Sequence, residues 1–198
     1  MTEIQQRPDR RRARHAGTKR EIVDAAWRLA REQGLGAWSL RDVADAVGMR
    51  APSLYGYFPS KDAVFDAMFA DGCAALLSRI ESAAAEAEGR PAQAVLQLGA
   101  TMFFDFCTED PARYQLLFLR TLPGFEPSEA SYALARAAID GVSRVLGPLG
   151  LDSPENVDLW TALTVGLVTQ QLSNEPGGDR WRRLVVPAVD MFLAAHRG

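Results

Sequence analysis

Histidine and cysteine are scarce in this chain, and their scarcity excludes several kinds of site. The 198 residues include two histidines, His15 and His196, and two cysteines, Cys73 and Cys107. The histidines lie near opposite ends of the sequence, while the cysteines form no CxxC motif and have no histidine nearby. The sequence therefore predicts no metal site, and we interpret the cysteines as reduced, buried thiols of a cytoplasmic protein.

Motifs of common catalytic centres and long apolar runs are missing as well. The sequence contains no HExxH zinc motif, no phosphate-binding P-loop, no GxSxG nucleophile turn and no GxGxxG dinucleotide loop. It therefore predicts no catalytic residue and no cofactor, as expected for a protein that is not an enzyme. No apolar run reaches the roughly 18 residues that a membrane-spanning helix needs, so we expect no membrane partner.

Alternating strand patterns are absent too, whereas apolar residues recur at helical spacing along nearly the whole chain. Glycine and proline residues divide this pattern into separate segments. The spacing predicts an all-α fold of about nine helices, of which Pro187 is expected to kink or shorten the last. The expected helices cover residues 19–33, 40–47, 51–57, 61–88, 91–107, 111–120, 128–146, 154–172 and 180–196.

The net charge of −3 hides an uneven distribution along the sequence. Residues 1–65 carry a net charge of +4 and residues 66–198 carry −7, while the first 20 residues alone carry +5. A basic N-terminal part on an acidic body favours contact with a polyanion such as double-stranded DNA. We interpret residues 1–17, which are polar and rich in arginine, as a disordered basic arm. A T-x-x-E capping box that begins at Thr18 is then expected to start the first helix.

Two short predicted helices in the N-terminal part form a helix-turn-helix pattern. Ser39 opens the first helix, Gly48 ends it, and Pro59 closes the second. In such a unit apolar residues lock the two helices together, while polar residues of the second helix enter a major groove. The expected locking residues are Val43, Ala44, Val47, Leu54 and Phe58, and the residues left for DNA are Arg50, Ser53, Tyr55 and Tyr57.

The residues of this pattern resemble the DNA-binding domain of TetR-family repressors over about residues 18–65. The shared features are a Ser cap, an Ala-x-Gly-apolar helix end, a Ser-Leu-Tyr-x-Tyr-Phe run and a final Lys-Asp pair, all within residues 39–62. Two positions depart from the family pattern. Val47 stands where alanine is common, and Arg50 stands where serine or threonine is common, so a helix cap is lost but a cation is gained.

The resemblance implies a role in DNA binding for ten residues. Tyr57 and Lys61 would hold phosphates, and Thr18 and Ser39 would contact phosphates at helix starts. Arg41 would contact a base or the DNA backbone. The residues that would face the bases are Arg50, Ala51, Pro52, Ser53 and Tyr55. For Tyr55, partial packing against its neighbours is an equally good reading of the sequence.

The resemblance also implies a second helical domain, over residues 66–198, that dimerises and encloses a small effector. For the pocket, the candidates are Met102, Phe103, Phe106, Tyr114, Phe118 and Trp160. For the dimer interface, the candidates are Ala133, Ala137, Leu163, Gly166, Leu167 and Gln170. Because apolar stripes at helical spacing are common in cores, packing inside the protomer remains the alternative for both sets.

Together these features predict a sequence-specific transcriptional regulator, as in the family that the chain resembles. We expect a homodimer that represses by binding a palindromic operator and that a small apolar effector releases. The alternative is a helical ligand- or protein-binding module whose DNA binding is independent of an effector or serves activation. Steep salt dependence of DNA affinity would distinguish the DNA reader from a protein-binding module.

Overall fold

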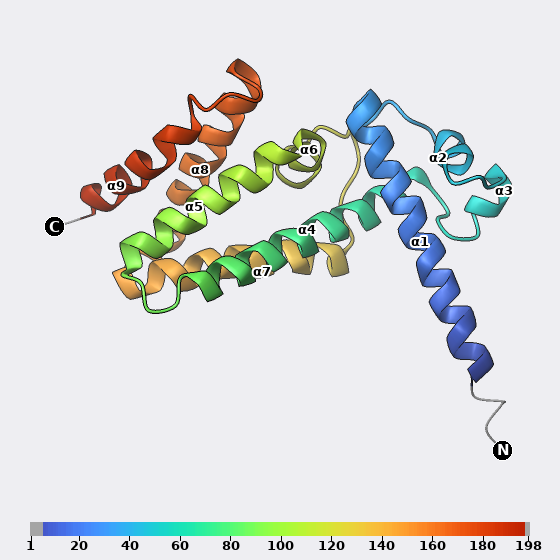
Figure 1. Cartoon of the computed structure of the whole chain (residues 1–198), viewed down its shortest axis with the longest axis horizontal. Coiled ribbons are helices and arrows are strands. Elements are labelled where there is room, and N and C mark those ends of the chain that lie inside the picture. The colour runs from blue at the N-terminus through green and yellow to red at the C-terminus, as the bar shows by residue number, and fades with distance from the viewer. Residues whose placement is uncertain (1–5, 197–198) are drawn as a thin grey trace.

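The computed structural model describes residues 6–196 and, within them, the side chains from residue 10 onward. Every regular element in this part of the chain is helical, which confirms the predicted all-α class (Figure 1). The α-helices are α1 (Gln6–Gln33), α2 (Leu40–Ala46), α3 (Ala51–Leu54), α4 (Lys61–Glu86), α5 (Ala92–Glu109), α6 (Pro111–Phe118), α7 (Glu129–Leu146), α8 (Pro154–Asn174) and α9 (Val185–Ala195), and the 3-10 helices are η1 (Gly147–Leu149) and η2 (Arg182–Leu184).

Helix starts coincide with polar side chains that accept hydrogen bonds from the free backbone N–H groups of the first turn. Ser60 caps α4, Asp110 caps α6, Ser128 caps α7 and Ser153 caps α8, each by accepting from the N–H group three residues ahead. Such caps satisfy donors that have no partner within the helix. The predicted starts of these helices are therefore correct to within a residue.

The first helix is much longer than the sequence predicted. Residues 6–17 belong to α1, so the expectation of a disordered arm was wrong there, and residues 1–5 lie outside the described residues. Between Pro8 and Gly17 the chain consists mainly of arginine and alanine, which favour helices, and proline is tolerated in a first turn. Thr18 consequently lies inside α1 and does not cap a helix start.

Two other helices are shorter than predicted. α3 ends at Leu54, after which residues 55–57 continue as a turn. The predicted last helix divides into the 3-10 helix η2 and α9, and Pro187 lies in the first turn of α9. This position agrees with the expected shortening, because a proline needs no N–H partner in a first turn.

Two hydrophobic cores share α4. The first core joins α1, α2 and α3 to the N-terminal half of α4, which contributes Val64, Phe65 and Met68. The second core joins α5, α7, α8 and α9 to the C-terminal half of α4 through Leu76. Figure 1 shows α4 running from the side of α1 into the layer formed with α5 and α7. The helix therefore connects the end of the molecule that holds α2 and α3 with the end that holds α8 and α9.

Polar contacts fasten α1 to the rest of the molecule. Asp71 of α4 forms an ion pair with Arg20 and accepts a hydrogen bond from the indole N–H of Trp27 at 3.0 Å. Arg31 donates to the carboxylate of Asp110, the buried residue that caps α6, at 2.8 Å. Because these contacts reach α4 and α6, the position of the first core is tied to helices that also meet the second core.

Candidate functional site

A capping box fixes the start of α2. The Ser39 hydroxyl oxygen accepts from the N–H of Asp42 at 3.3 Å, and the Asp42 carboxylate accepts from the backbone N–H of Ser39 at 2.7 Å. The hydrogen bonds from Ser39 hold the pKa of the Asp42 carboxyl below its ordinary value. Ser39 and Arg41 are both exposed at this end of α2, where a phosphate contact is sterically open to them.

Backbone geometry at Gly48 sets the turn between α2 and α3. Gly48 has a φ of 67°, which favours glycine, and the next N–H group, from Met49, closes the turn on the carbonyl of Ala44 at 2.8 Å. Val43, Ala44 and Leu54 are fully buried beneath the turn. These three residues lock the helices as the sequence predicted, and Phe58 is buried beside them while Val47 is half-buried.

The outer side of α3 presents most of the residues predicted to face the bases. Arg50, Pro52 and Ser53 are exposed, Ala51 is half-buried, and Tyr55 has 55% of its surface exposed. Tyr55 is therefore not packed into the core. Arg50 precedes α3 with extended backbone and makes no capping hydrogen bond, so its guanidinium is not committed to the helix start. Figure 1 shows α2 and α3 together at one end of the molecule, away from α5, α8 and α9.

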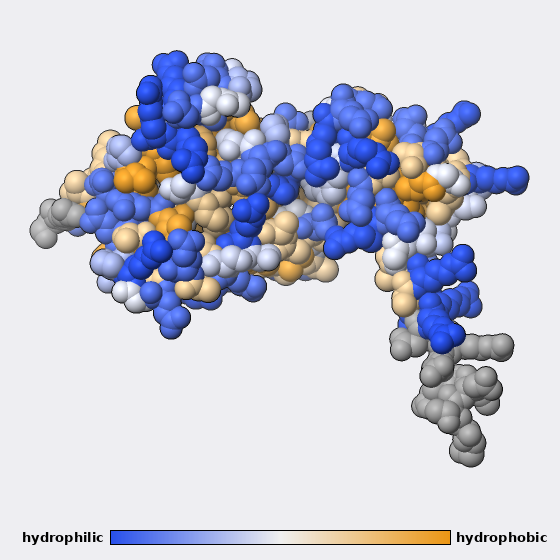
Figure 2. Space-filling model, in the orientation of Figure 1, coloured by the Kyte–Doolittle hydropathy of each residue, from blue (hydrophilic) through white to orange (hydrophobic). Residues whose placement is uncertain are grey.

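The N-terminal extension of α1 approaches this surface through an aromatic stack. The ring of His15 lies 4.7 Å from that of Tyr57, and the two planes differ by 20°. Exposed arginines precede His15 on the same helix, namely Arg10, Arg11, Arg12 and Arg14. Figure 2 shows hydrophilic residues covering the described start of α1 where it leaves the body of the molecule. The sequence analysis missed the stack, although the unbroken run of helix-forming residues before Gly17 indicated a longer helix.

Lys61 is engaged within the protein. Its ammonium group donates to the carbonyl oxygen of Gly36 at 2.8 Å and lies 4.6 Å from the ring centre of Trp38. Burial lowers the pKa of Lys61 from its ordinary value. The side chain closes the loop between α1 and α2 over Trp38, a buried residue that the sequence analysis did not single out. A phosphate contact by Lys61 would replace or share the Gly36 contact.

Thr18 does not occupy the position that its predicted role requires. It lies in the interior of α1, half-buried, so it offers no free helix start to a phosphate. The cause is the helical extension before it, which supplies hydrogen-bond partners to the backbone groups that a helix start would leave free.

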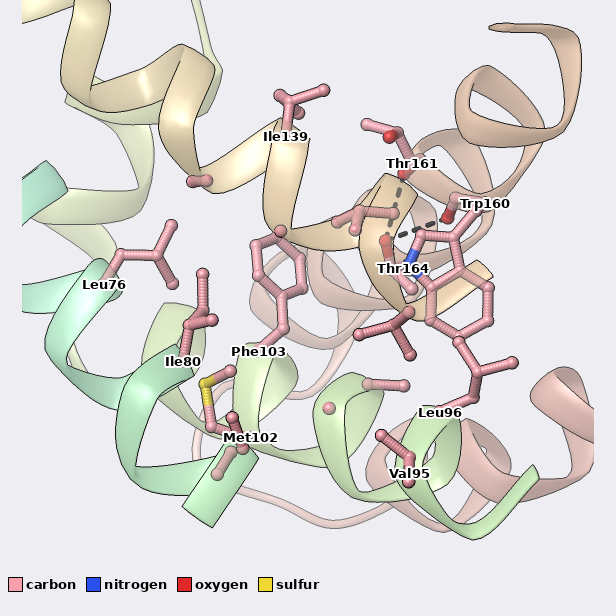
Figure 3. A pocket seen from close by; sticks show the side chains of 18 of the residues that line it. Leu76, Ile80, Val95, Leu96, Met102, Phe103, Ile139, Trp160, Thr161 and Thr164 are labelled. Carbon is pink, nitrogen blue, oxygen red and sulfur yellow. Dashed lines mark hydrogen bonds between the residues drawn. The ribbon is translucent and has the colours of Figure 1, made fainter. Parts of the chain in front are cut away.

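A cavity of about 520 Å³ lies in the second core, between α4, α5, α7 and α8 (Figure 3). Four of the predicted pocket residues line it: Met102, Phe103, Phe118 and Trp160. The other two do not line it, so these predictions were wrong. Tyr114 is buried, and its hydroxyl lies 2.7 Å from that of Thr169. Phe106 is also buried, and the guanidinium carbon of Arg113 lies 3.7 Å from the centre of its ring.

The sequence analysis missed most of the cavity wall that α4 and α7 provide. On α4 the lining residues are small or aliphatic and recur every three or four positions, which is one face of a helix. This stripe was visible in the sequence, but nothing in it distinguishes a cavity wall from a filled core. The lining residues of α4 are Cys73, Leu76, Ile80, Ala83 and Ala84, and those of α7 are Ala135, Ala138, Ile139, Gly141, Val142 and Val145.

The residues predicted for a dimer interface lie at or near the surface of α7 and α8. Ala133, Gly166 and Gln170 are exposed, whereas Ala137, Leu163 and Leu167 are half-buried. Larger apolar side chains are exposed on the same two helices: Tyr132, Ile139 and Leu159.

Within the described residues no cluster of histidine, cysteine and acidic side chains could hold a metal ion. No helix in that part of the chain has both the length and the apolar character needed to cross a membrane.

The short helices, the glycine turn and the exposed side of α3 define a helix-turn-helix protein of the DNA-binding regulators. Residues 22–68 match the sequence model described as "Bacterial regulatory proteins, tetR family". Over this segment the chain carries the DNA-binding domain of TetR-family regulators. Members of such a regulator family act on DNA rather than by catalysis, and the matched segment holds α2, α3 and the start of α4.

Relatives extend the likeness beyond the matched segment. The HTH-type transcriptional repressor DrrR1 from Streptomyces coeruleorubidus is 29% identical over 191 residues, which cover 89% of this chain and 64% of that protein. The chain spans less than two thirds of the length of the curated relatives it matches.

Solved structures share the fold at low identity. A protein of unknown function from Rhodococcus sp. RHA1 has a TM-score of 0.75 at 21% identity, with 89% of this chain and 94% of that chain covered. The regulator FadR from Bacillus subtilis, solved in complex with stearoyl-CoA, has a TM-score of 0.63 at 18% identity, with 88% and 97% covered.

Proposed function

We propose that this protein is a transcriptional repressor that binds a palindromic operator as a homodimer and that a small molecule in the cavity of the second core releases it. Residues 18–65 would read DNA, and residues 66–198 would dimerise and hold the effector. The observation that carries the proposal is the uncommitted outer side of α3, where Arg50, Ser53 and Tyr55 are exposed on a helix that a buried core holds in place.

Base reading would come from α3 and its flanking residues. Arg50 carries a guanidinium that can donate two hydrogen bonds to a guanine edge, and Ser53 and Tyr55 add hydroxyl groups beside it. Arg41, Ser39, Tyr57 and Lys61 would contact phosphates around this surface. The arginines of the α1 extension add positive charge beside Tyr57, where the flanking duplex would pass.

The proposal includes a homodimer because one α3 helix covers only a short stretch of DNA. Exposed apolar residues on α7 and α8, including Ile139 and Leu159, offer a surface that a second copy would bury. Two-fold symmetry would then place the two α3 helices in successive major grooves of a palindrome.

The link between the effector and DNA would be α4. Its C-terminal half lines the cavity with Leu76 and Ile80, while its N-terminal half packs against α1, α2 and α3. A ligand that favours one position of α4 would change the spacing of the two α3 helices in the dimer. Repression would end because the half-site spacing would no longer match.

The test is selection of DNA from a randomised duplex library by the purified full chain at moderate and high salt. We expect a short palindrome at moderate salt and its loss at high salt. Arg50→Ala and Tyr55→Ala should relax the selected sequence, whereas the control Arg90→Ala, exposed in the turn between α4 and α5, should not. Failure to enrich any sequence would overturn the proposal.

A further inference from the structure

The cavity wall is almost free of charge and of polar atoms. Apart from the peptide backbone, its polar groups are the hydroxyls of Thr161 and Thr164, the thiol of Cys73, the carboxylate of Glu88 and the indole N–H of Trp160. Burial raises the pKa of the Cys73 thiol to about 11, so that this group is neutral. No arginine, lysine or histidine belongs to the wall formed by the described residues.

This composition disfavours an anionic ligand. A carboxylate or phosphate buried in an apolar site costs several kcal/mol unless a cation or several donors meet it. Glu88, the one charged residue of the wall, is exposed and would repel an anion near it. A fatty acid or an acyl-CoA headgroup would therefore lack a partner in this cavity.

The polar end of the cavity fits a hydroxyl group. Thr164 donates its hydroxyl hydrogen to backbone carbonyls of its own helix, at 3.0 Å to Trp160 and 3.2 Å to Thr161, so its oxygen is left to accept. Thr161 donates in the same way to the carbonyl of Val157 at 2.8 Å. Trp160 lies one helical turn before Thr164 on α8, and its indole N–H is a donor in the same wall (Figure 3). Acceptors and a donor therefore lie together on α8.

An alcohol or phenol can satisfy both with a single neutral oxygen atom. It donates to a threonine oxygen and accepts from the indole N–H, whereas an ether only accepts and a hydrocarbon does neither. The remaining wall is apolar, and the volume of about 520 Å³ lies in the range of pockets for drug-sized molecules.

We propose that the effector of this protein is a neutral, mainly apolar molecule that carries a hydroxyl group, bound with that hydroxyl at Thr161, Thr164 and Trp160. The assignment rests on the proposed function for its role in regulation, but binding itself does not depend on DNA. A neutral effector of this kind would distinguish this chain from FadR, whose solved structure holds stearoyl-CoA.

Gly99 offers a way to close the cavity without disturbing the fold. It lies on α5 in the wall, and a Cβ added there would meet no atom within 4 Å. Gly99→Phe should fill the space between Leu96 and Phe103, one turn away on either side. Gly99→Ala adds a single methyl group and is the matched control.

The experiment uses four probes with the same twelve-carbon chain: 1-dodecanol, its methyl ether, dodecanoate and dodecylammonium. Each displaces the neutral fluorescent dye N-phenyl-1-naphthylamine from the full-length protein at neutral pH. We expect 1-dodecanol to displace the dye at concentrations at least tenfold below those of dodecanoate and severalfold below those of the ether. Gly99→Phe should abolish dye binding, while Gly99→Ala retains it.

Thr164→Val tests the anchor directly, because valine keeps the shape and removes the hydroxyl. The ratio between the displacing concentrations of the ether and the alcohol, both measured on the variant, should shrink severalfold. Glu88→Arg should lower the concentration at which dodecanoate displaces the dye. Circular dichroism of each variant confirms that it folds, and Gly99→Leu replaces Gly99→Phe if the larger side chain prevents folding.

Three outcomes would overturn the inference. Equal or tighter binding of dodecanoate would show that anions are accepted, tighter binding of dodecylammonium would indicate a cation site, and dye binding unaffected by Gly99→Phe would place the ligand elsewhere. These outcomes are separate from those for the proposed function, since DNA selection is measured without any probe. If the alcohol binds but leaves DNA affinity unchanged, the ligand assignment stands and release by an effector fails.

Discussion

The two cores of the molecule differ in what they leave unfilled. In the first core, buried residues such as Ile22, Val43 and Leu54 are fully excluded from solvent, and the groups proposed to read DNA lie outside on α3. In the second core, α4, α5, α7 and α8 surround a cavity, and the groups proposed to bind a ligand lie inside. A reading surface needs a rigid support, whereas a ligand site needs volume that the protein itself does not occupy.

The largest expected effect comes from emptying the first core. Leu54→Ala removes a fully buried side chain between α2, α3 and α1, and should lower the free energy of unfolding by about 2–5 kcal/mol. The matched change in the second core is Leu146→Ala, at an equally buried position. Urea unfolding followed by tryptophan fluorescence measures both.

These two variants also test whether the cores unfold together. Trp38 reports on the first core and Trp160 on the second. Because α4 belongs to both, we expect one transition in which each variant lowers the midpoint at both tryptophans. Separate midpoints for a protein that retains only Trp38 of the four tryptophans and one that retains only Trp160 would mean that the cores are independent.

A smaller effect is expected at the contact between α1 and α6. Asp110→Ala removes both the cap of α6 and the buried partner of Arg31, and should cost about 1–3 kcal/mol. Half of the Arg31 side chain is exposed, so solvent screening keeps the ion pair itself weak. Glu129→Ala, which breaks an exposed pair with Arg136, is the control and should leave the thermal midpoint nearly unchanged.

Gly99→Ala should act in the opposite direction. Glycine inside a helix costs stability relative to alanine, and the added methyl group meets open space in the cavity, so the variant should gain about 0.5–1 kcal/mol. Thermal unfolding measures the gain. A loss of stability would mean that the space is already occupied, which would remove the contrast between the two cores.

The smallest effect concerns the pH dependence of the first core. Since the pKa of Asp42 is lowered in the folded protein, its contribution to stability is complete above the ordinary value of 3.8 and is lost as the pH falls through the folded value. Asp42→Asn should therefore reduce the fall in the free energy of unfolding at acidic pH, as measured by urea unfolding at a series of pH values. Asp45→Asn, exposed on the same helix, should leave that fall in place.

Most helices of both cores could be predicted from the sequence. The two sites differ, because the exposed residues of α3 were predicted and the cavity was not. Spacing of apolar residues and capping residues such as Ser39, Ser60 and Asp110 are local signals, so most helix starts could be predicted. The exposure of Arg50 and Ser53 followed from the same periodicity. The cavity could not be predicted in this way, because it depends on how far four helices stand apart. Phe103 lines it and Phe106 does not, although both are aromatic residues of one helix.

Two positions show how structure outside a motif acts on its residues. Thr18 resembled a helix cap because a threonine followed by a glutamate three residues later fits that pattern, yet the helix continues through it. Lys61 remains a predicted phosphate ligand, but its ammonium group already contacts a carbonyl and an indole ring of the loop between α1 and α2. In each case a contact or a helix outside the motif constrains what the motif residue does.

The continuous helix shared by the two cores imposes a strict phase on its own sequence. Successive residues of an α-helix are rotated by about 100°, so one residue inserted between Phe69 and Cys73 would turn the cavity stripe of α4 away from α5 while leaving the first core intact. An insertion of seven residues, close to two full turns, would restore the direction and move the two cores apart by about 10 Å. Length changes within α4 should therefore preserve both cores only in steps that keep the rotational register.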